Sequence, residues 1–121
     1  YEKDYRNATC PRRNRPYVQG VDLGSMVFTP GKFRFARQTG EIPADVQDQA
    51  RLSLENVKAI GLLPADVGDI IKMTVFITDL NDFATINEVY KQFFDEHQAT
   101  YPTRSCVQVA RLPKDVKLEI E

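Results

Sequence analysis

Residues 69–78, Asp-Ile-Ile-Lys-Met-Thr-Val-Phe-Ile-Thr, constrain the fold more than any other part of the sequence. The segment is rich in β-branched residues and is almost continuously apolar. This composition is typical of a central strand with both faces covered. The rest of the chain must therefore supply neighbouring strands for it, and helices or strands that cover its faces.

Two amphipathic helices are predicted, one on either side of this strand in the sequence. Before it, apolar residues recur with the spacing of one helical face: Val46, Ala50, Leu54, Val57 and Ile60. Pro43 suits a first helical position, and Gly61 and Pro64 suit the end. After the strand, a cap at Asp79 or Asn81 precedes a second helical face: Phe83, Ile86, Tyr90, Phe93 and His97. We expect this face, together with Phe94, to enter the core.

Further strands are predicted towards both ends of the chain: 17–21, 26–28, 104–111 and 116–121. The first two flank the tight turn Asp22-Leu23-Gly24-Ser25 and should form a hairpin. Residues 32–37 form either an edge strand or a loop. This order of elements predicts an α+β fold, in which a mixed β-sheet carries both helices on one face. We expect a single domain over residues 1–121.

The last two strands indicate what the other sheet face presents. Alternation places Arg104 and Cys106 on one side of the first of them and Val107 on the other. In the second, Glu119 points away from the apolar residues. Treating these strands as neighbours, we expect Arg104, Cys106 and Glu119 to share the face without helices. Such a mixed face favours a homo-oligomeric interface, although an antiparallel sheet can also leave it solvated.

The composition excludes several classes of protein. The 121 residues are 42% hydrophobic and 27% charged, which suits one globular core. No apolar run approaches the roughly 20 residues that a membrane-spanning helix needs. One histidine and two distant cysteines, Cys10 and Cys106, do not form a structural zinc site. The two cysteines are far apart in the sequence, which predicts free thiols in a reducing compartment and hence a cytoplasmic protein.

Charge is unevenly distributed along the chain. The net charge is −1, but residues 1–40 hold 8 basic and 3 acidic residues, whereas residues 41–121 hold 8 and 14. The basic run Arg12-Arg13-Asn14-Arg15 could contact the phosphates of RNA, or it could belong to a solvated arm. No stacking aromatic residue is interleaved with it, which favours the arm.

Arg104 is the residue best suited to bind an anionic substrate. A guanidinium can donate two parallel hydrogen bonds to a carboxylate. Cys106 and Glu119, placed on the same face, would add a thiol and a carboxylate that could activate water. On these residues alone, the alternative is a structural salt bridge beside an inert cysteine.

Two adjoining segments resemble the signature of the RidA/YjgF family, the reactive-intermediate deaminases: Pro102-Thr103-Arg104-Ser105-Cys106-Val107 and Val109-Ala110-Arg111-Leu112-Pro113-Lys114-Asp115. Further segments that match the family are Thr39-Gly40-Glu41-Ile42-Pro43 and Asp79-Leu80-Asn81-Asp82-Phe83. The resemblance covers residues 16–29 and 38–121.

The resemblance implies a chorismate mutase-like fold and a homotrimer with clefts between its subunits. It implies a hydrolase that releases ammonia from 2-imino acids and their enamine tautomers, such as 2-iminobutyrate and 2-iminopropanoate, without a metal or other cofactor. These compounds arise from dehydratases that act on threonine or serine. The implied partners are the small-molecule substrate and further copies of the chain, with no membrane and no nucleic acid.

The resemblance also assigns roles to individual residues. Arg104 would bind the substrate carboxylate, and Glu119 would position or activate the water. The other cleft residues would be Tyr17, Asn87, Cys106 and the backbone at Gly31. The family usually has Thr-Ser-Gly-Gln where this chain has Thr29-Pro30-Gly31-Lys32. Pro30 lacks a hydroxyl and an N–H group, so the polar lining of the cleft is altered.

Two other functions are compatible with the same residues. A non-catalytic protein that senses 2-ketobutyrate or a related carboxylate would need the same Arg104. RNA binding or cleavage depends on the basic arm alone and ranks behind both.

Overall fold

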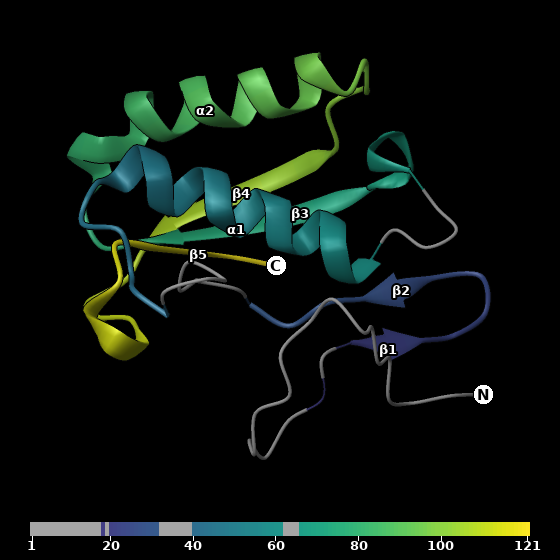
Figure 1. The fold of residues 1–121 in the computed structure, drawn as a ribbon, viewed down its shortest axis with the longest axis horizontal. Coiled ribbons are helices and arrows are strands. Elements are labelled where there is room, and N and C mark those ends of the chain that lie inside the picture. Colours follow the sequence, from purple (N-terminus) through teal and green to yellow (C-terminus); the bar gives the residue numbers. More distant parts are fainter. Residues whose placement is uncertain (1–17, 19, 32–39, 62–65) are drawn as a thin grey trace.

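The computed structural model describes residues 18, 20–31, 40–61 and 66–121. Two helices dominate it, α1 (Val46–Gly61) and α2 (Phe83–Glu96). The strands are β1 (Val21–Asp22), β2 (Val27–Phe28), β3 (Lys72–Ile77), β4 (Thr103–Gln108) and β5 (Leu118–Ile120). Three short 3-10 helices lie at Val67–Asp69, Leu80–Asp82 and Pro113–Asp115. Figure 1 shows both helices on the same side of β3, β4 and β5.

The three longer strands form a mixed sheet in the order β4-β3-β5. β3 pairs with β4 in parallel and with β5 antiparallel. The prediction of a central strand within 69–78 is therefore confirmed. The prediction that the last two strands are neighbours is wrong, because β3 lies between β4 and β5. The 3-10 helix at Pro113–Asp115, with Lys114 at a φ of 63°, lies in the connection that leads from β4 to the far side of β3.

The β1–β2 hairpin is confirmed as a separate two-stranded antiparallel sheet. Its turn contains Gly24 at a φ of +84°, a conformation that favours glycine. The Asp22 carboxylate accepts a hydrogen bond from the Gly24 N–H at 2.7 Å and so stabilises the turn. Each strand is only two residues long, which is shorter than the sequence predicted. Tyr17 and Gln19 lie outside the described residues, as do residues 32–37.

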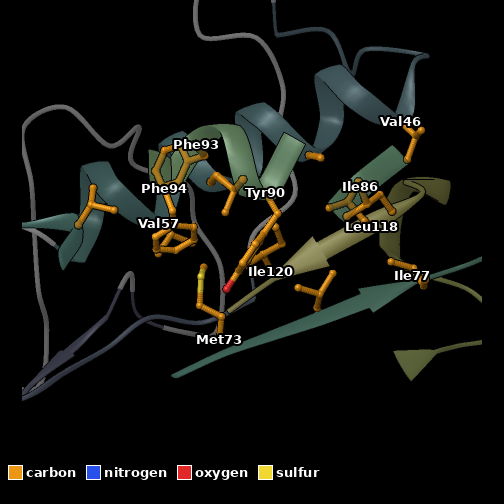
Figure 2. Close-up of a cluster of buried hydrophobic side chains, with 14 residues drawn as sticks. Val46, Val57, Met73, Ile77, Ile86, Tyr90, Phe93, Phe94, Leu118 and Ile120 are labelled. Atoms are coloured by element: carbon orange, nitrogen blue, oxygen red, sulfur yellow. The ribbon is translucent and has the colours of Figure 1, made fainter. Parts of the chain in front are cut away.

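The core lies between the two helices and the sheet, and Figure 2 shows it. α1 contributes the predicted face, with Val46, Ala50, Leu54 and Val57 buried. α2 contributes Ile86, Tyr90, Phe93 and Phe94, as predicted. The sheet contributes alternate residues, Met73, Val75, Ile77, Leu118 and Ile120. Phe83 differs from the prediction, because it is 38% exposed. The side chain of Ile60 lies outside the described residues.

Within the described residues, the helices cover one face of the sheet and leave the other face partly exposed. On β3, the residues that alternate with the buried ones are exposed at Lys72 and half-buried at Thr74 and Phe76. On β4, Val107 on the same face is 44% exposed. The described residues of one protomer cover β3 on one face, so the prediction of cover on both faces depends on a further copy of the chain and stays a prediction. The prediction of an α+β fold with both helices on one face is confirmed.

The start of α1 differs slightly from the prediction. The helix begins at Val46, three residues after Pro43, because the Asp45 carboxylate accepts from the Gln47 N–H at 2.6 Å and caps it. The Pro43 carbonyl instead accepts from the Gln49 side chain at 2.7 Å. The predicted cap at Asp79 or Asn81 is not the cap of α2, whose N-cap is Asp82 without a side-chain hydrogen bond. The Asp79 side chain instead accepts from the Asn81 N–H at 2.9 Å. It caps the 3-10 turn that leads into α2.

Within the described residues, neither helix is long and apolar enough to cross a membrane.

Candidate active site

Arg104 lies on β4 and faces α2. It pairs in register with Met73, and Cys106 pairs with Val75. Both β3 partners are buried against the helices, and paired residues of parallel strands point to the same face. The Arg104 guanidinium carbon lies 4.7 Å from the ring centroid of Tyr90 and 5.6 Å from that of Phe83. Arg104 is therefore on the helix-covered face and not on the uncovered face that the sequence predicted.

No carboxylate of the described residues forms an ion pair with Arg104. Ion pairs in the described part of the chain involve Arg51, Lys91 and Arg111, and none includes Arg104. Its in-plane N–H groups have no hydrogen-bond acceptor among the same residues. The alternative of a structural salt bridge between Arg104 and Glu119 is thus not observed within the protomer. A half-buried guanidinium in this state is suited to receive an anion.

Cys106 is half-buried beside Arg104 and packs against the core. Burial raises the pKa of its thiol, and the nearby Arg104 charge opposes that shift. The thiol is therefore mostly protonated at neutral pH. A protonated, partly buried thiol is a poor nucleophile, so this environment favours a lining role over a chemical one. Cys10 lies outside the described residues.

Glu119 lies on β5 and faces away from the helices. It pairs with Phe76, whereas its neighbours Leu118 and Ile120 pair with the buried Ile77 and Val75. Gly31 approaches Glu119 closely: a Cβ atom built on Gly31 would lie 2.8 Å from the carboxyl carbon of Glu119. The segment after β2 is therefore in contact with β5 at this glycine. The structure brings together these two predicted site residues, which are far apart in the sequence.

The predicted site residues thus fall into two groups on opposite faces of the sheet. Arg104 and Cys106 lie on the face that α2 covers, and Glu119 and Gly31 lie on the other. The prediction that Arg104 and Glu119 share a face is wrong, because it placed the apolar Val107, and not Arg104, on the core side of the strand. One protomer does not place both groups in one pocket.

α2 carries two polar atoms that are buried without a hydrogen-bond partner in the described structure, the Asn87 Oδ1 and the Tyr90 hydroxyl. Phe83, Asn87 and Tyr90 are spaced by four and three residues and so share one stripe of the helix. Along this stripe of the helix, Asn87 therefore lies between Phe83 and Tyr90, the two aromatic residues that contact Arg104. Burial raises the pKa of Tyr90 to about 12, although the Arg104 charge opposes the shift. The hydroxyl keeps its proton at physiological pH.

Sequence reasoning assigned Tyr90 and Phe83 to the core face and missed their contact with Arg104. The spacing of Phe83 and Tyr90, seven residues apart on one helical face, was the sequence feature that could have indicated this contact. Of the other candidates, Tyr17 lies outside the described residues. His97, expected on the core face, is half-buried at the end of α2: its Nδ1 lies 2.6 Å from the Phe93 carbonyl oxygen, and its Nε2 lies 2.9 Å from the Lys58 ammonium. The described residues hold no group of three or more histidine, cysteine, aspartate or glutamate side chains that could bind a metal ion.

Comparison with known proteins identifies the family. A model described as Endoribonuclease L-PSP matches residues 8–121. The chain therefore belongs to this family, the RidA/YjgF family, as the resemblance predicted.

Two curated relatives from Escherichia coli (strain K12) are similar over most of the chain. TdcF, a protein named for reactive intermediate deaminase activity, is 87% identical over 107 residues, which are 88% of this chain and 83% of TdcF. A 2-iminobutanoate/2-iminopropanoate deaminase is 59% identical over 123 residues, which cover 98% of this chain and 94% of that protein.

A solved structure has the same fold. The crystal structure of E. coli TdcF with bound serine matches with a TM-score of 0.92 and 78% sequence identity, and the match covers 98% of this chain and 94% of that one. That structure shows a small amino acid bound to TdcF.

Proposed function

We propose that this protein hydrolyses 2-imino acids and their enamine tautomers, such as 2-iminobutyrate and 2-iminopropanoate, to 2-keto acids and ammonia. The observation that carries the proposal is a half-buried Arg104 without an acceptor in the described structure, held beside Cys106 and the orphaned polar atoms of α2. Membership of a family with named deaminases at 87% and 59% identity supports it.

Hydrolysis of an imine needs few catalytic groups. Water adds to the C=N carbon, the nitrogen gains protons and leaves as ammonia, and a C=O bond replaces the C=N bond. Because imines also hydrolyse in water, a site needs only to orient substrate and water and to stabilise the developing charge. Arg104 would hold the substrate carboxylate by two parallel hydrogen bonds. Glu119 would position the water and accept its proton.

The separation of Arg104 and Glu119 on opposite sheet faces bears on the assembly. We propose a homotrimer in which each cleft lies between two subunits. One subunit would supply Arg104, Cys106 and Asn87, and its neighbour would supply Glu119 and Gly31. The exposed apolar surface on the outer sheet face, with Val107 44% exposed, supports contact with another copy of the chain. We further propose that the single domain works in the cytoplasm without a cofactor.

The alternative is a protein that binds small carboxylates without turnover. Arg104 serves both functions, so binding alone does not separate them. Glu119 does, because a carboxylate that positions water is needed for hydrolysis and not for holding a product.

A coupled assay tests the proposal. Threonine dehydratase generates 2-iminobutyrate, and semicarbazide traps what the protein does not hydrolyse. We expect the protein to lower the trapped fraction, and Arg104→Ala to lose at least about 30-fold in kcat/KM, as expected for removing one partner of a desolvated charge pair. Glu119→Gln should lose turnover but still bind 2-ketobutyrate by calorimetry. Unchanged imine decay with intact 2-ketobutyrate binding would identify a sensor instead.

A further inference from the structure

The Arg104 guanidinium lies against two aromatic rings of α2, which we call the aromatic clamp (Phe83 and Tyr90). The distances to the ring centroids are 5.6 Å and 4.7 Å, both within the range of cation–π contacts. The two rings are seven residues apart, or about two helical turns, so both project towards β4. Figure 2 shows Tyr90 pointing from α2 towards the sheet that carries Arg104.

Core packing alone does not account for the aromatic clamp, although Tyr90 also packs on Phe94, with ring centroids 4.8 Å apart. Phe83 is 38% exposed and does not belong to the buried core cluster. Tyr90 is 7% exposed and its hydroxyl has no hydrogen-bond partner in the described structure, although a buried tyrosine usually finds one. An aliphatic residue would fill the Tyr90 position without an orphaned hydroxyl. The contact that the two aromatic residues share is the one with Arg104.

We infer that Phe83 and Tyr90 are positioning residues, which hold Arg104 in the orientation that binds the substrate carboxylate. This inference rests on the proposed function. A ring attracts a guanidinium through its face and leaves the in-plane N–H groups available. Those N–H groups are the ones that donate in parallel to a carboxylate. The aromatic clamp thus immobilises a long, flexible side chain before the ligand arrives, which lowers the entropy lost on binding.

The test measures 2-ketobutyrate binding by calorimetry, with 2-ketobutyramide as a ligand that lacks the carboxylate. Tyr90→Leu removes the ring and keeps apolar volume, and we expect it to weaken 2-ketobutyrate binding about tenfold. Tyr90→Phe keeps the ring and should recover the affinity that Tyr90→Leu loses. Binding of 2-ketobutyramide should not change between Tyr90→Leu and Tyr90→Phe. In an Arg104→Met background, Tyr90→Leu should have no further effect on either ligand.

Phe83→Leu is the second variant, because a residue that is 38% exposed can be changed with little risk to folding. We expect it to weaken 2-ketobutyrate binding about threefold, with circular dichroism and melting temperature unchanged. The inference is overturned if Tyr90→Leu and Phe83→Leu bind 2-ketobutyrate like the wild type. It is also overturned if Tyr90→Leu weakens binding equally in the Arg104→Met background.

The same series separates this inference from the proposed function. If Arg104→Met binds 2-ketobutyrate as tightly as the wild type, the proposed carboxylate site is wrong, and the positioning role is wrong with it. If Arg104→Met loses binding while both single variants of the aromatic clamp retain it, only the positioning role is wrong.

Discussion

The Glu119 carboxyl group lies directly against the backbone of Gly31, in the space that any other residue at position 31 would fill with a Cβ atom. That Cβ would lie 2.8 Å from the carboxyl carbon and 3.0 Å from the Cγ of Glu119. A side chain at position 31 would therefore displace the end of the Glu119 side chain from its present position. The contact fixes where the carboxylate of β5 lies relative to the segment that follows β2.

Replacing Gly31 with alanine should displace Glu119. The added methyl group overlaps the carboxylate, which must rotate away, so we expect kcat to fall at least about tenfold while 2-ketobutyrate binding through Arg104 changes little. The overlap should also destabilise the fold by about 1–3 kcal/mol, as overpacking usually does. Steady-state kinetics and urea unfolding measure the two effects. A Gly31→Ala variant with wild-type kcat would show that the position of Glu119 is unimportant for turnover.

The elements of the fold were largely predictable, and the relation between its strands was not. Apolar spacing located both helices and β3, because burial against one core enforces those periods. No comparable periodicity in the sequence indicates which strands are adjacent in the sheet. A short connection between β4 and β5 suggested a hairpin, yet β5 crosses to the far side of β3.

A separate error placed Arg104 on the wrong face. The period of two correctly grouped Arg104 with Cys106, and Glu119 opposite Leu118 and Ile120. Alternation does not fix which group faces the helices. The apolar Val107 suggested the core side, but it is 44% exposed. The roles of Arg104 and Glu119 came from the family resemblance, and their residue types alone would have left a structural salt bridge as an alternative.

The Cys106 thiol should react slowly with alkylating agents in the folded protein. Burial raises its pKa, so less thiolate is present at pH 8 than for the same cysteine in the unfolded chain. We expect iodoacetamide to modify Cys106 several-fold faster after denaturation in guanidinium, as measured by peptide mass spectrometry. Cys106→Ser should retain most of the deaminase activity. Loss of activity in Cys106→Ser at unchanged stability would instead indicate a chemical role for the thiol.

Acid should weaken the contact between the two helices through Glu96. The Arg51 guanidinium of α1 donates a hydrogen bond to the Glu96 carboxylate of α2, which lowers the pKa of Glu96. The unfolded chain therefore takes up this proton at higher pH than the folded chain does. The stabilisation is present above the ordinary glutamate pKa and is lost as the pH falls through the lower folded value.

The measurement is the melting temperature of the wild type and of Glu96→Gln between about pH 7 and about pH 3. We expect the wild type to be the more stable at neutral pH and the difference to shrink as the pH falls. Because both partners are on the surface, about 0.5 M salt should also reduce it. A pH-independent difference would mean that Glu96 contributes through packing and not through charge.

Pro30→Ser should raise activity. Pro30 is half-buried and directly precedes Gly31. The resemblance described under Sequence analysis implies serine at this position. A serine restores a hydroxyl and an N–H group next to Glu119, and one well-placed hydrogen bond is worth about 1 kcal/mol. We expect kcat/KM to rise about threefold to tenfold in the coupled assay. The variant should melt slightly earlier, because proline restricts the unfolded chain. Unchanged kinetics would place the hydroxyl outside the reacting site.

The separation of Arg104 and Glu119 by the thickness of the sheet has a consequence for mixtures of variants. In the homotrimer proposed above, each chain would carry two half-sites that cannot serve each other. Two inactive proteins, Arg104→Ala and Glu119→Gln, should regain activity when they are unfolded together and refolded, since mixed assemblies contain some clefts with both wild-type halves. For the same reason, a doubly substituted chain expressed beside the wild type would inactivate more clefts than its own share of subunits.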